Sequence, residues 1–287
     1  MTNLYQDIKS KLTSLNVLEQ IIVINTIVFI LSSFLSLLSN KSGYQILNIF
    51  SLSNDIWEVL LYPWTILTYG FFHYSFTHLF FNMLVLFFLA RTFSNLFLPR
   101  LALKVYLLGI ISGALFFSIT SYLIPGIINI NAPLVGASAG VRACIIFLCV
   151  YMPTKLVSFF RFSFKLKYLG ILMVFLDLPG LFSTNSGGTI AHIGGYVLGY
   201  FYANQLQNGK EIGLFLDKIL DYFNSKSFFK MFQRKKMNIN SKISRQRRGD
   251  FSNQKQVDLI LDKISKSGYE SLTQKEKDFL FRAGKNK

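Results

Sequence analysis

The feature that most constrains this chain is a series of long apolar runs that contain almost no charged residues. The first run, Ile21–Leu38, is long enough to cross a bilayer, whose hydrocarbon core is spanned by a helix of about 20 residues. Only 15% of the 287 residues are charged and 52% are hydrophobic, whereas roughly a quarter of a soluble domain is charged. The sequence therefore argues against an ordinary soluble domain and predicts an all-α membrane protein.

Six such runs predict six membrane-spanning helices, each bounded by charged residues or by Pro, Gly and Ser. The runs are Ile21–Leu38, His78–Leu98, Leu101–Leu123, Gly136–Tyr151, Tyr168–Phe182 and Ile190–Leu206. No small-residue cleavage pattern follows the first run, so we expect it to be a retained helix and not a signal peptide. Leu60–Phe72 is apolar and aromatic but too short to span, which suits a segment lying in the membrane interface.

An even number of spans places both termini on one side of the membrane. The basic residues outside the spans then gather on that side, in the N-terminal segment, in the turns 91–104 and 155–167, and in the tail. The opposite loops contain Lys41 as their one basic residue. By the positive-inside rule, we expect an integral multi-pass membrane protein with both termini cytoplasmic.

Residues 208–287 differ from the rest of the chain in charge. They contain 19 Lys and Arg against 9 Asp and Glu, a net charge of +10, and residues 1–207 contain 11 against 5, a net charge of +6. We therefore expect a membrane domain over residues 1–207 and a basic cytoplasmic extension over residues 208–287. An anionic membrane surface explains this charge at lower cost than nucleic acid does, so we expect anionic lipids and no nucleic acid as partners.

Within this extension the sequence predicts short helices joined by a linker. Leu214–Met231 is basic and rich in Leu and Phe, which suits a helix on the membrane surface. Residues 237–255 are polar and are expected to form the linker. Val257–Ile264 and Thr273–Phe281 are expected to be two short helices, the second beginning with the capping-box sequence Thr-Gln-Lys-Glu.

The first candidate for chemistry is Ser138, within the sequence Gly-Ala-Ser-Ala-Gly of residues 136–140. Its small neighbours leave the hydroxyl accessible to a substrate carbonyl. In soluble hydrolases, a G-x-S-x-G sequence presents a nucleophilic serine on a turn between a strand and a helix. In membrane helices, clusters of small residues also allow close helix packing. The motif alone is compatible with either role.

The three histidines of the chain are all expected at the depth of Ser138, near the non-cytoplasmic surface. Polar groups within a membrane are costly and commonly functional. His192 could take the proton of the serine hydroxyl, and His78 and Asn82 share one helix face from which both could donate to an oxyanion. Three histidines could instead hold zinc, but no carboxylate or thiolate joins His73 and the others in a ligand spacing. We therefore expect no metal and no cofactor.

Three motifs now support a family resemblance. His73-x4-His78-x3-Asn82, the G-x-S-x-G of residues 136–140 and the A-H-x-x-G-x-x-x-G of residues 191–199 resemble, in order and spacing, those of the rhomboid intramembrane serine proteases. The resemblance covers about residues 15–207. It implies a six-transmembrane-helix bundle and a serine endopeptidase that cuts peptide bonds in or near transmembrane segments of other membrane proteins. The extension resembles that of some bacterial rhomboids, which implies the bacterial inner membrane.

The resemblance also implies roles for individual residues. Ser138 would be the nucleophile and His192 the base, in a dyad without an acidic third member. His78 and Asn82, together with the backbone N–H of Ser138, would form the oxyanion hole. His73 would hold the first loop in place and take no part in the chemistry.

Other positions would support this site. Gly136 belongs to the serine motif, and Gly195 and Gly199 would let the sixth helix approach the fourth. Ser183–Thr189 would be a flexible cap through which a substrate helix enters. Thr65, in the first loop, stands where the family usually has an arginine.

The sequence leaves a second class of function open, a catalytically inactive rhomboid-like protein that binds and escorts membrane proteins. Inactive members typically lose the serine or the histidine, and this chain contains both, which favours the protease.

Arg142 departs from the family pattern, which often has an aromatic or small residue at this position, one helical turn from the serine. A charge there is costly in hydrocarbon unless it is paired. Asp177 is expected at a similar depth in the fifth span. We expect the two side chains to form an ion pair in which Asp177 is structural and not a third catalytic member. The alternative is that Arg142 faces a water-filled cavity and Asp177 forms only local hydrogen bonds.

Overall fold

The computed structural model describes residues 4–38, 48–124, 133–159, 162–225, 260, 262–264, 268 and 271–278. The chain divides into two units, Met1–Ile219 and Leu220–Lys287. Helices dominate the described part of both. Sequence-based expectations for Lys41 and for the linker at residues 237–255 lie outside the described residues, as do most of Val257–Ile264 and the end of Thr273–Phe281.

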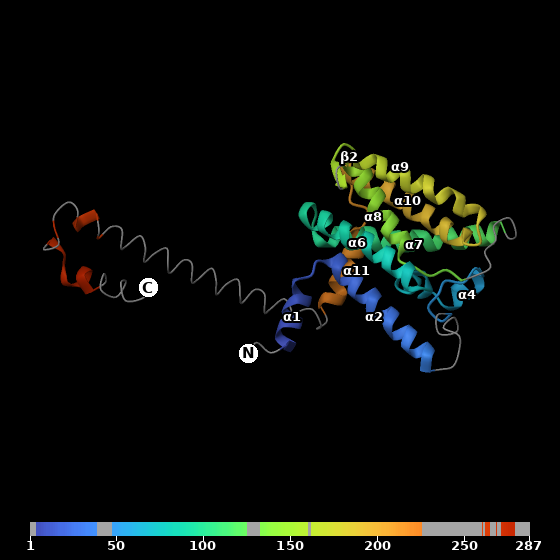
Figure 1. Ribbon diagram of the computed structural model, residues 1–287, viewed down its shortest axis with the longest axis horizontal. Coiled ribbons are helices and arrows are strands. Elements are labelled where there is room, and N and C mark those ends of the chain that lie inside the picture. The colour runs from blue at the N-terminus through green and yellow to red at the C-terminus, as the bar shows by residue number, and fades with distance from the viewer. Residues whose placement is uncertain are drawn as a thin grey trace. The chain divides into compact units, whose positions relative to one another are not determined.

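The first unit begins with the helices α1 and α2, and shorter helical elements follow them (Figure 1). The elements in this part are α1 (Leu4–Ser14), α2 (Val17–Leu38), α4 (Ile56–Leu61), α5 (Thr65–Thr68) and the 3-10 helix η1 (Tyr69–Phe71). Asp55 caps α4, because its carboxylate accepts from the N–H of Trp57 at 2.9 Å. The apolar stretch Leu60–Phe72 is therefore a set of short helical turns, consistent with its being too short to span.

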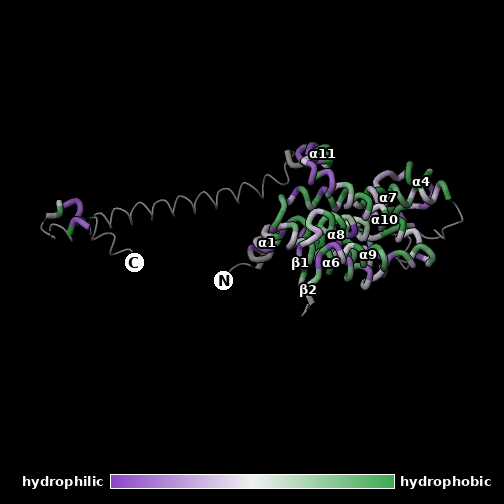
Figure 2. Tube along the Cα trace, turned by 90° about the horizontal axis from the view of Figure 1, so that it is seen from above, coloured by the Kyte–Doolittle hydropathy of each residue, from purple (hydrophilic) through white to green (hydrophobic). Residues whose placement is uncertain are grey.

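The bundle itself consists of the helices that follow Ser75, the last of which continues past the end of the first unit at Ile219. They are α6 (Phe76–Leu96), α7 (Pro99–Leu123), α8 (Ser138–Tyr151), α9 (Leu166–Asp177) with the 3-10 helix η2 (Leu178–Phe182), α10 (Ser186–Gln207) and α11 (Leu214–Ser225). The ribbon is apolar over most of this unit, whereas α1 and α11 contain hydrophilic segments (Figure 2).

Three helices of the described residues are long and apolar enough to cross a membrane, namely α2, α6 and α7. The apolar helix α8 has 14 residues and α9 has 12, fewer than the approximately 20 that span a bilayer. Large apolar side chains such as Phe88 and Phe175 are 64% and 67% exposed, as expected for surfaces that face lipid. The structure thus supports a multi-pass membrane protein, and the count of six spans stays a prediction.

The predicted fifth helix, Tyr168–Phe182, begins at Leu166 in the structure, and its last five residues have a different helix type. The α-helix ends at Asp177, and residues Leu178–Phe182 continue as η2. Pro179 explains the change, because proline has no N–H to donate and its ring clashes with the carbonyl four residues earlier. The predicted loop Ser183–Thr189 is also too long, since α10 already begins at Ser186.

Between α8 and α9 the chain forms a hairpin that the sequence analysis did not predict. Strand β1 (Leu156–Phe159) pairs with β2 (Phe162–Lys165) in antiparallel fashion, with Leu156 opposite Lys165 and Val157 opposite Phe164. Four-residue strands are too short for a clear period-2 pattern, and the basic residues around them indicated only a turn.

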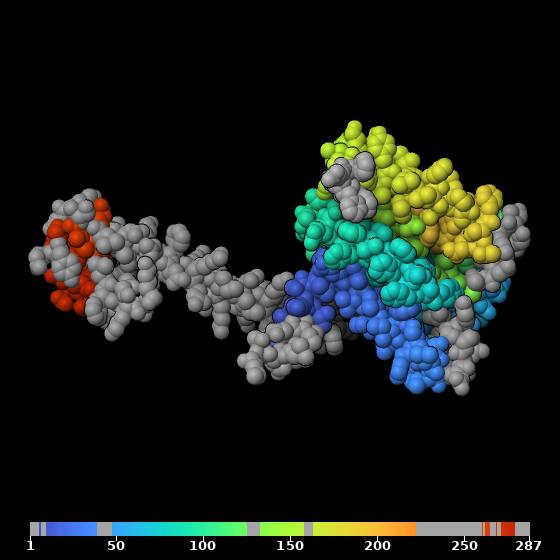
Figure 3. Space-filling view, in the orientation of Figure 1, coloured from blue at the N-terminus to red at the C-terminus, as the bar shows by residue number. Residues whose placement is uncertain are grey.

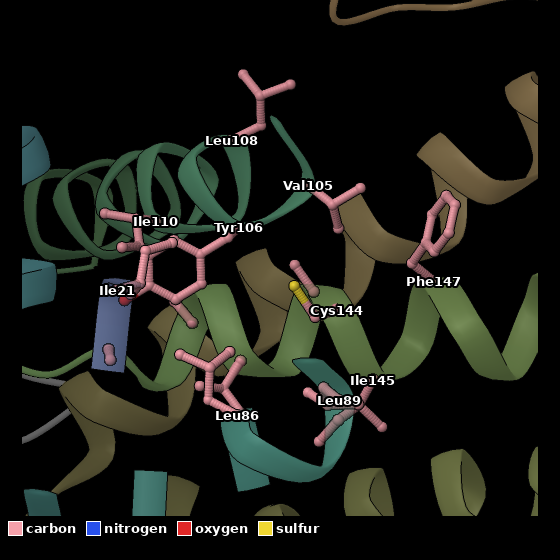
Figure 4. Close-up of a cluster of buried hydrophobic side chains, with 14 of the residues drawn as sticks. Ile21, Leu86, Leu89, Val105, Tyr106, Leu108, Ile110, Cys144, Ile145 and Phe147 are labelled. Carbon is pink, nitrogen blue, oxygen red and sulfur yellow. The ribbon is translucent and has the colours of Figure 1, made fainter. Parts of the chain in front are cut away.

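The core lies where α7, α8 and α10 pack together, with α6 and α2 alongside. Figure 4 shows side chains of α2, α6, α7 and α8 there, among them Leu86 from α6, Tyr106 from α7 and Cys144 from α8. All three are fully buried. On the surface, α6 lies beside α2 (Figure 3). Buried apolar packing therefore fixes α7, α8 and α10, the helices around the serine motif.

The segment before α6 is attached to the rest of the first unit by hydrogen bonds to backbone groups. The Tyr69 hydroxyl donates to the Ile110 carbonyl of α7 at 2.7 Å. Leu52 and Leu134 exchange two backbone hydrogen bonds, of 3.0 and 2.8 Å. Thr65 is 3% exposed and its hydroxyl donates to the Tyr62 carbonyl at 2.7 Å. Thus the segment is held on α7 and on the residues before Ser138.

At the other end of the bundle, α11 is joined to α7 through a buried cation. Lys104 is 5% exposed, and its ammonium lies 2.8 Å from Asp217 and 3.3 Å from Glu211. The Tyr202 hydroxyl of α10 also donates to Glu211. The start of the basic extension is therefore part of the first unit.

In the second unit, the predicted capping box is confirmed. The Thr273 N–H donates to the Glu276 carboxylate at 2.7 Å, and the Glu276 N–H donates to the Thr273 hydroxyl at 3.4 Å. Lys263 also contacts Glu276, at 3.0 Å. Hydrogen bonds from Thr273 and the nearby Lys263 cation lower the pKa of Glu276 to about 2.

Candidate active site

Ser138 and His192 meet between two helices of the bundle. Ser138 is the first residue of α8, and His192 lies in the second turn of α10. His192 Nε2 is 2.8 Å from Ser138 Oγ, which is a hydrogen-bond distance. The structure thus brings together two side chains that are far apart in the sequence.

Glycines allow this approach of α10 to α8. A Cβ atom on Gly195 would collide with the carbonyl oxygen of Ala139, and one on Gly199 would collide with that of Ala143. Gly194 is equally close to α7, because a Cβ there would lie 2.6 Å from the Ser112 carbonyl oxygen. Small residues at the contact let the helix backbones come close, and this proximity sets the distance between Ser138 and His192.

The backbone before Ser138 has a shape that only glycine adopts readily. Gly136 has φ +131°, and a Cβ atom there would lie 2.6 Å from Cε1 of His78 and 2.8 Å from Nε2. Its N–H donates to the Tyr69 carbonyl at 2.9 Å. The His78 ring therefore packs directly on the Gly136 backbone, close to the Ser138 hydroxyl.

Asn82 lies one helical turn from His78 on α6. Its side-chain amide donates to the His78 carbonyl at 2.9 Å, and the residue is 7% exposed. A primary amide has two N–H donors, so a second one can be directed to a ligand. Both residues line the same cleft as Ser138.

His73 lies behind the site, where it is 2% exposed. The N–H of Ala137 donates to His73 Nε2 at 3.4 Å, and the His73 ring meets the His78 ring edge-on with 4.9 Å between centroids. Burial and the neighbouring His78 lower the pKa of His73 to about 3. A neutral His73 thus accepts a hydrogen bond from the backbone directly before Ser138.

The cleft at Ser138 has a volume of about 690 Å³. Its polar part contains Ser138, His192, His78, Asn82 and Arg142, and its apolar part includes Phe81, Val85, Val141 and Met173. Residues Thr184, Asn185, Gly187 and Gly188 border it. Such a cleft can take an apolar peptide segment while the polar groups face its backbone.

The expected pair of Arg142 and Asp177 is confirmed. Arg142 Nε donates to Asp177 Oδ2 at 3.1 Å and its Nη2 donates to Oδ1 at 3.3 Å. The two side chains are 16% and 17% exposed. This two-pronged geometry suits a guanidinium and a carboxylate, and it gives the cation close to the serine its partner.

Asp177 has two further contacts that the sequence analysis missed. His192 Nδ1 lies 2.9 Å from Asp177 Oδ2, and the Tyr196 hydroxyl donates to the same oxygen. Tyr196 also contacts the Met173 carbonyl, at 3.2 Å. His192 and Tyr196 are four residues apart and share one helix face. This spacing could have predicted the contacts, because an acidic residue at that depth would face both side chains.

The fold and the site define a class, a helical membrane protein with a hydrogen-bonded serine and histidine in a cleft between its helices. The sequence model of the rhomboid domain matches residues 61–208, and the chain belongs to the rhomboid family. Members of this family are generally serine proteases that act on membrane-protein substrates within the bilayer.

A second sequence model matches residues 238–285 and is described as a family of unknown function (DUF6576). A comparison with curated proteins found no match.

Proposed function

We propose that this protein is an intramembrane serine endopeptidase that hydrolyses peptide bonds in or near transmembrane segments of other membrane proteins. The observation that carries the proposal is the 2.8 Å separation of His192 Nε2 from Ser138 Oγ within a bundle of apolar helices. A serine is a weak nucleophile unless a neighbouring base takes its proton. The imidazole is at the distance that this proton transfer requires.

The reaction begins when Ser138 Oγ attacks the carbonyl carbon of the scissile bond and His192 Nε2 takes the hydroxyl proton. The tetrahedral intermediate collapses as His192 gives this proton to the leaving amine nitrogen, which leaves an acyl ester on Ser138. A water molecule then attacks the ester while His192 takes its proton. That proton returns to Ser138 Oγ when the acid product leaves.

The developing oxyanion would be stabilised by the backbone N–H of Ser138 and by the side chains of His78 and Asn82. The first N–H groups of a helix have no acceptor within the helix, and the helix dipole is positive there. Because Ser138 is the first residue of α8, its N–H meets this condition. Donors of this kind, fixed before the reaction, are among the largest contributions to such catalysis.

The proposal extends to the arrangement of the chain in the membrane. Residues 1–207 would form the protease domain with six membrane-spanning helices, in the bacterial inner membrane with both termini cytoplasmic. Residues 208–287 would form a basic extension that contacts anionic lipids. Substrate helices would reach the cleft beside residues 184–188, which border it.

The experiment is cleavage of single-span membrane substrates by the purified full-length protein in liposomes, beside Ser138→Ala and His192→Ala. Both variants should fold and should not cleave, a fluorophosphonate should label Ser138 in the wild-type protein alone, and a chelator should leave the rate unchanged. Cleavage by Ser138→Ala at the wild-type rate would refute the proposal. Specific binding of the substrates by the wild-type protein without cleavage or labelling would instead identify an inactive rhomboid-like escort protein.

A further inference from the structure

We propose that Asp177 is a positioning residue for His192, so that the site works as a serine–histidine–aspartate arrangement clamped by Arg142 and Tyr196. The expected effect on the rate of substrate cleavage rests on the proposed protease function. The expected effect on which nitrogen of the His192 imidazole carries the proton does not. The starting observation is that one carboxylate oxygen, Asp177 Oδ2, meets His192 Nδ1 at 2.9 Å.

The contacts of Asp177 determine which nitrogen of His192 carries the proton. An ionised carboxylate has acceptors and no donor, and a neutral imidazole has one donor and one acceptor. His192 Nδ1 must therefore be the N–H that donates to Asp177, which leaves Nε2 as the acceptor. Since Nε2 is the nitrogen 2.8 Å from Ser138 Oγ, Asp177 selects the form of His192 that can receive the serine proton.

Arg142 and Tyr196 tie this carboxylate to the two helices that carry the reacting groups. Arg142 lies four residues after Ser138 on α8, and Tyr196 lies four residues after His192 on α10. Each is therefore one helical turn from its reacting residue and on the same face. Through their hydrogen bonds to Asp177, the end of α9 is held against both sides of the site.

The position of Asp177 in its own helix also calls for such partners. Asp177 is the last residue of α9, and a negative charge at the C-terminal end of a helix is unfavourable with the helix dipole. Its side chain is only 17% exposed, so water can offset little of this unfavourable interaction with the helix dipole. Donors from Arg142, His192 and Tyr196 stabilise the anion there.

The carboxylate also acts during the proposed reaction. When Nε2 takes the Ser138 proton, the imidazole becomes a cation whose Nδ1–H still donates to Asp177. The anion stabilises that cation and keeps the ring in place until Nε2 passes the proton to the leaving nitrogen. Asp177 itself takes no proton in this sequence.

A purely structural ion pair with Arg142 is the competing role, and the two differ in what a double variant does. In Asp177→Asn, the Arg142 charge loses its anion, which should lower stability as well as turnover. In Asp177→Asn/Arg142→Gln, neither charge is present, so stability should return. If Asp177 positions His192, turnover should stay low in both variants.

The first measurement is the tautomer of His192, by NMR of the full-length protein labelled with nitrogen-15 histidine at a pH where the ring is neutral. Only three histidines contribute, and His192→Gln identifies the signal. We expect a protonated Nδ1 and an unprotonated Nε2 in the wild-type protein, and loss of this preference in Asp177→Leu/Arg142→Leu. The same preference in both proteins would overturn the proposal.

The second measurement is turnover of a membrane substrate together with thermal unfolding. We expect kcat to fall by roughly 10⁴-fold in Asp177→Asn and in the double variant, as for loss of the aspartate in other serine proteases, with KM changed much less. Asp217→Asn removes one of the carboxylates that contact Lys104. Asp217 is far from Ser138 in the sequence and does not line its cleft. This control should lower stability and leave kcat unchanged.

Recovery of both stability and kcat in Asp177→Asn/Arg142→Gln would overturn the proposal, because the aspartate would then only neutralise Arg142. If the wild-type protein does not cleave, the proposed function fails, and the tautomer measurement still decides whether Asp177 sets the state of His192.

Discussion

At the scale of single residues, geometry distinguishes the side chains around Ser138 by what they contact. His192 contacts the hydroxyl directly, at 2.8 Å. His78 and Asn82 line the same cleft from α6, and His73 lies behind them with its Nε2 turned to the Ala137 N–H. Substitutions should therefore affect turnover, binding and stability in different proportions.

Asn82→Ala and His78→Ala should each slow turnover without eliminating it. Removing one fixed oxyanion donor typically raises the barrier by about 2.7–4 kcal/mol, or about 10²- to 10³-fold in rate. Such donors act in the transition state, so kcat should fall much more than substrate binding weakens. Steady-state kinetics in liposomes test this. An equal loss of binding and turnover would assign that face of α6 a structural role.

Gly136→Ala should lower kcat by a similar factor, roughly 10²- to 10³-fold, because the new Cβ atom would displace the His78 ring. The matched control is Gly209→Ala. Gly209 also has a positive φ, +72°, but a Cβ there would have no neighbour within 4 Å. Both variants should lose stability in thermal unfolding, and only Gly136→Ala should lose turnover. A similar kcat for the two variants would contradict the role of His78.

At the scale of the elements, the distance from Ser138 to His192 depends on how closely α10 packs on α8. Gly195 is one turn beyond His192 and touches the backbone at Ala139, the residue after Ser138. The distance between α10 and α8 therefore determines the distance between His192 and Ser138.

Gly195→Ala should consequently lower both stability and turnover. Extra volume at a tight contact typically destabilises by about 1–3 kcal/mol, and separation of the helices would lengthen the hydrogen bond between His192 and Ser138. Val197→Leu adds a methylene at a residue that is 47% exposed on the same helix and should change neither property. Thermal unfolding and fluorophosphonate labelling rates measure the two effects. Wild-type labelling of Gly195→Ala would show that the site tolerates a wider helix contact.

The elements also show what the sequence could and could not predict. The long helices α2, α6 and α7 are recognisable because an apolar run of their length with so few charges has few other stable states. The pair of Arg142 and Asp177 was predictable from depth and charge. The end of α9 was misjudged, because the apolar residues after Asp177 masked the effect of Pro179. The contact of Asp177 with His192 was missed because depth and charge indicated only Arg142 as the partner of Asp177.

At the scale of the whole molecule, the first unit extends past the predicted domain boundary at residue 207. Lys104 on α7 is buried, and the carboxylates nearest to it in the described residues, Glu211 and Asp217, come from the extension. A boundary at residue 207 would remove the anions that neutralise this cation. The structural unit is therefore longer than the part that matches the rhomboid domain, which ends at residue 208.

Replacing both anions, in Glu211→Gln/Asp217→Asn, should leave Lys104 buried without a counter-charge. Loss of the partner of a buried charge typically destabilises by about 3–5 kcal/mol, whereas replacing the whole group by apolar residues is nearly neutral. Adding Lys104→Met should therefore recover most of the thermal stability. Turnover should be unchanged in all of these proteins. No recovery in the triple variant would mean that the carboxylates act through other partners.

The bond between the end of α9 and His192 has a consequence for the order of events in a catalytic cycle. Asp177 belongs to a helix that borders the cleft, and the residues after it lead to the segment 184–188 at the cleft margin. A displacement of this helix end that widened the cleft would also draw the carboxylate away from the imidazole. If the protein is the proposed protease, His192 would then lose its aspartate contact whenever the cleft widened, and the site would react only when this helix end is in place.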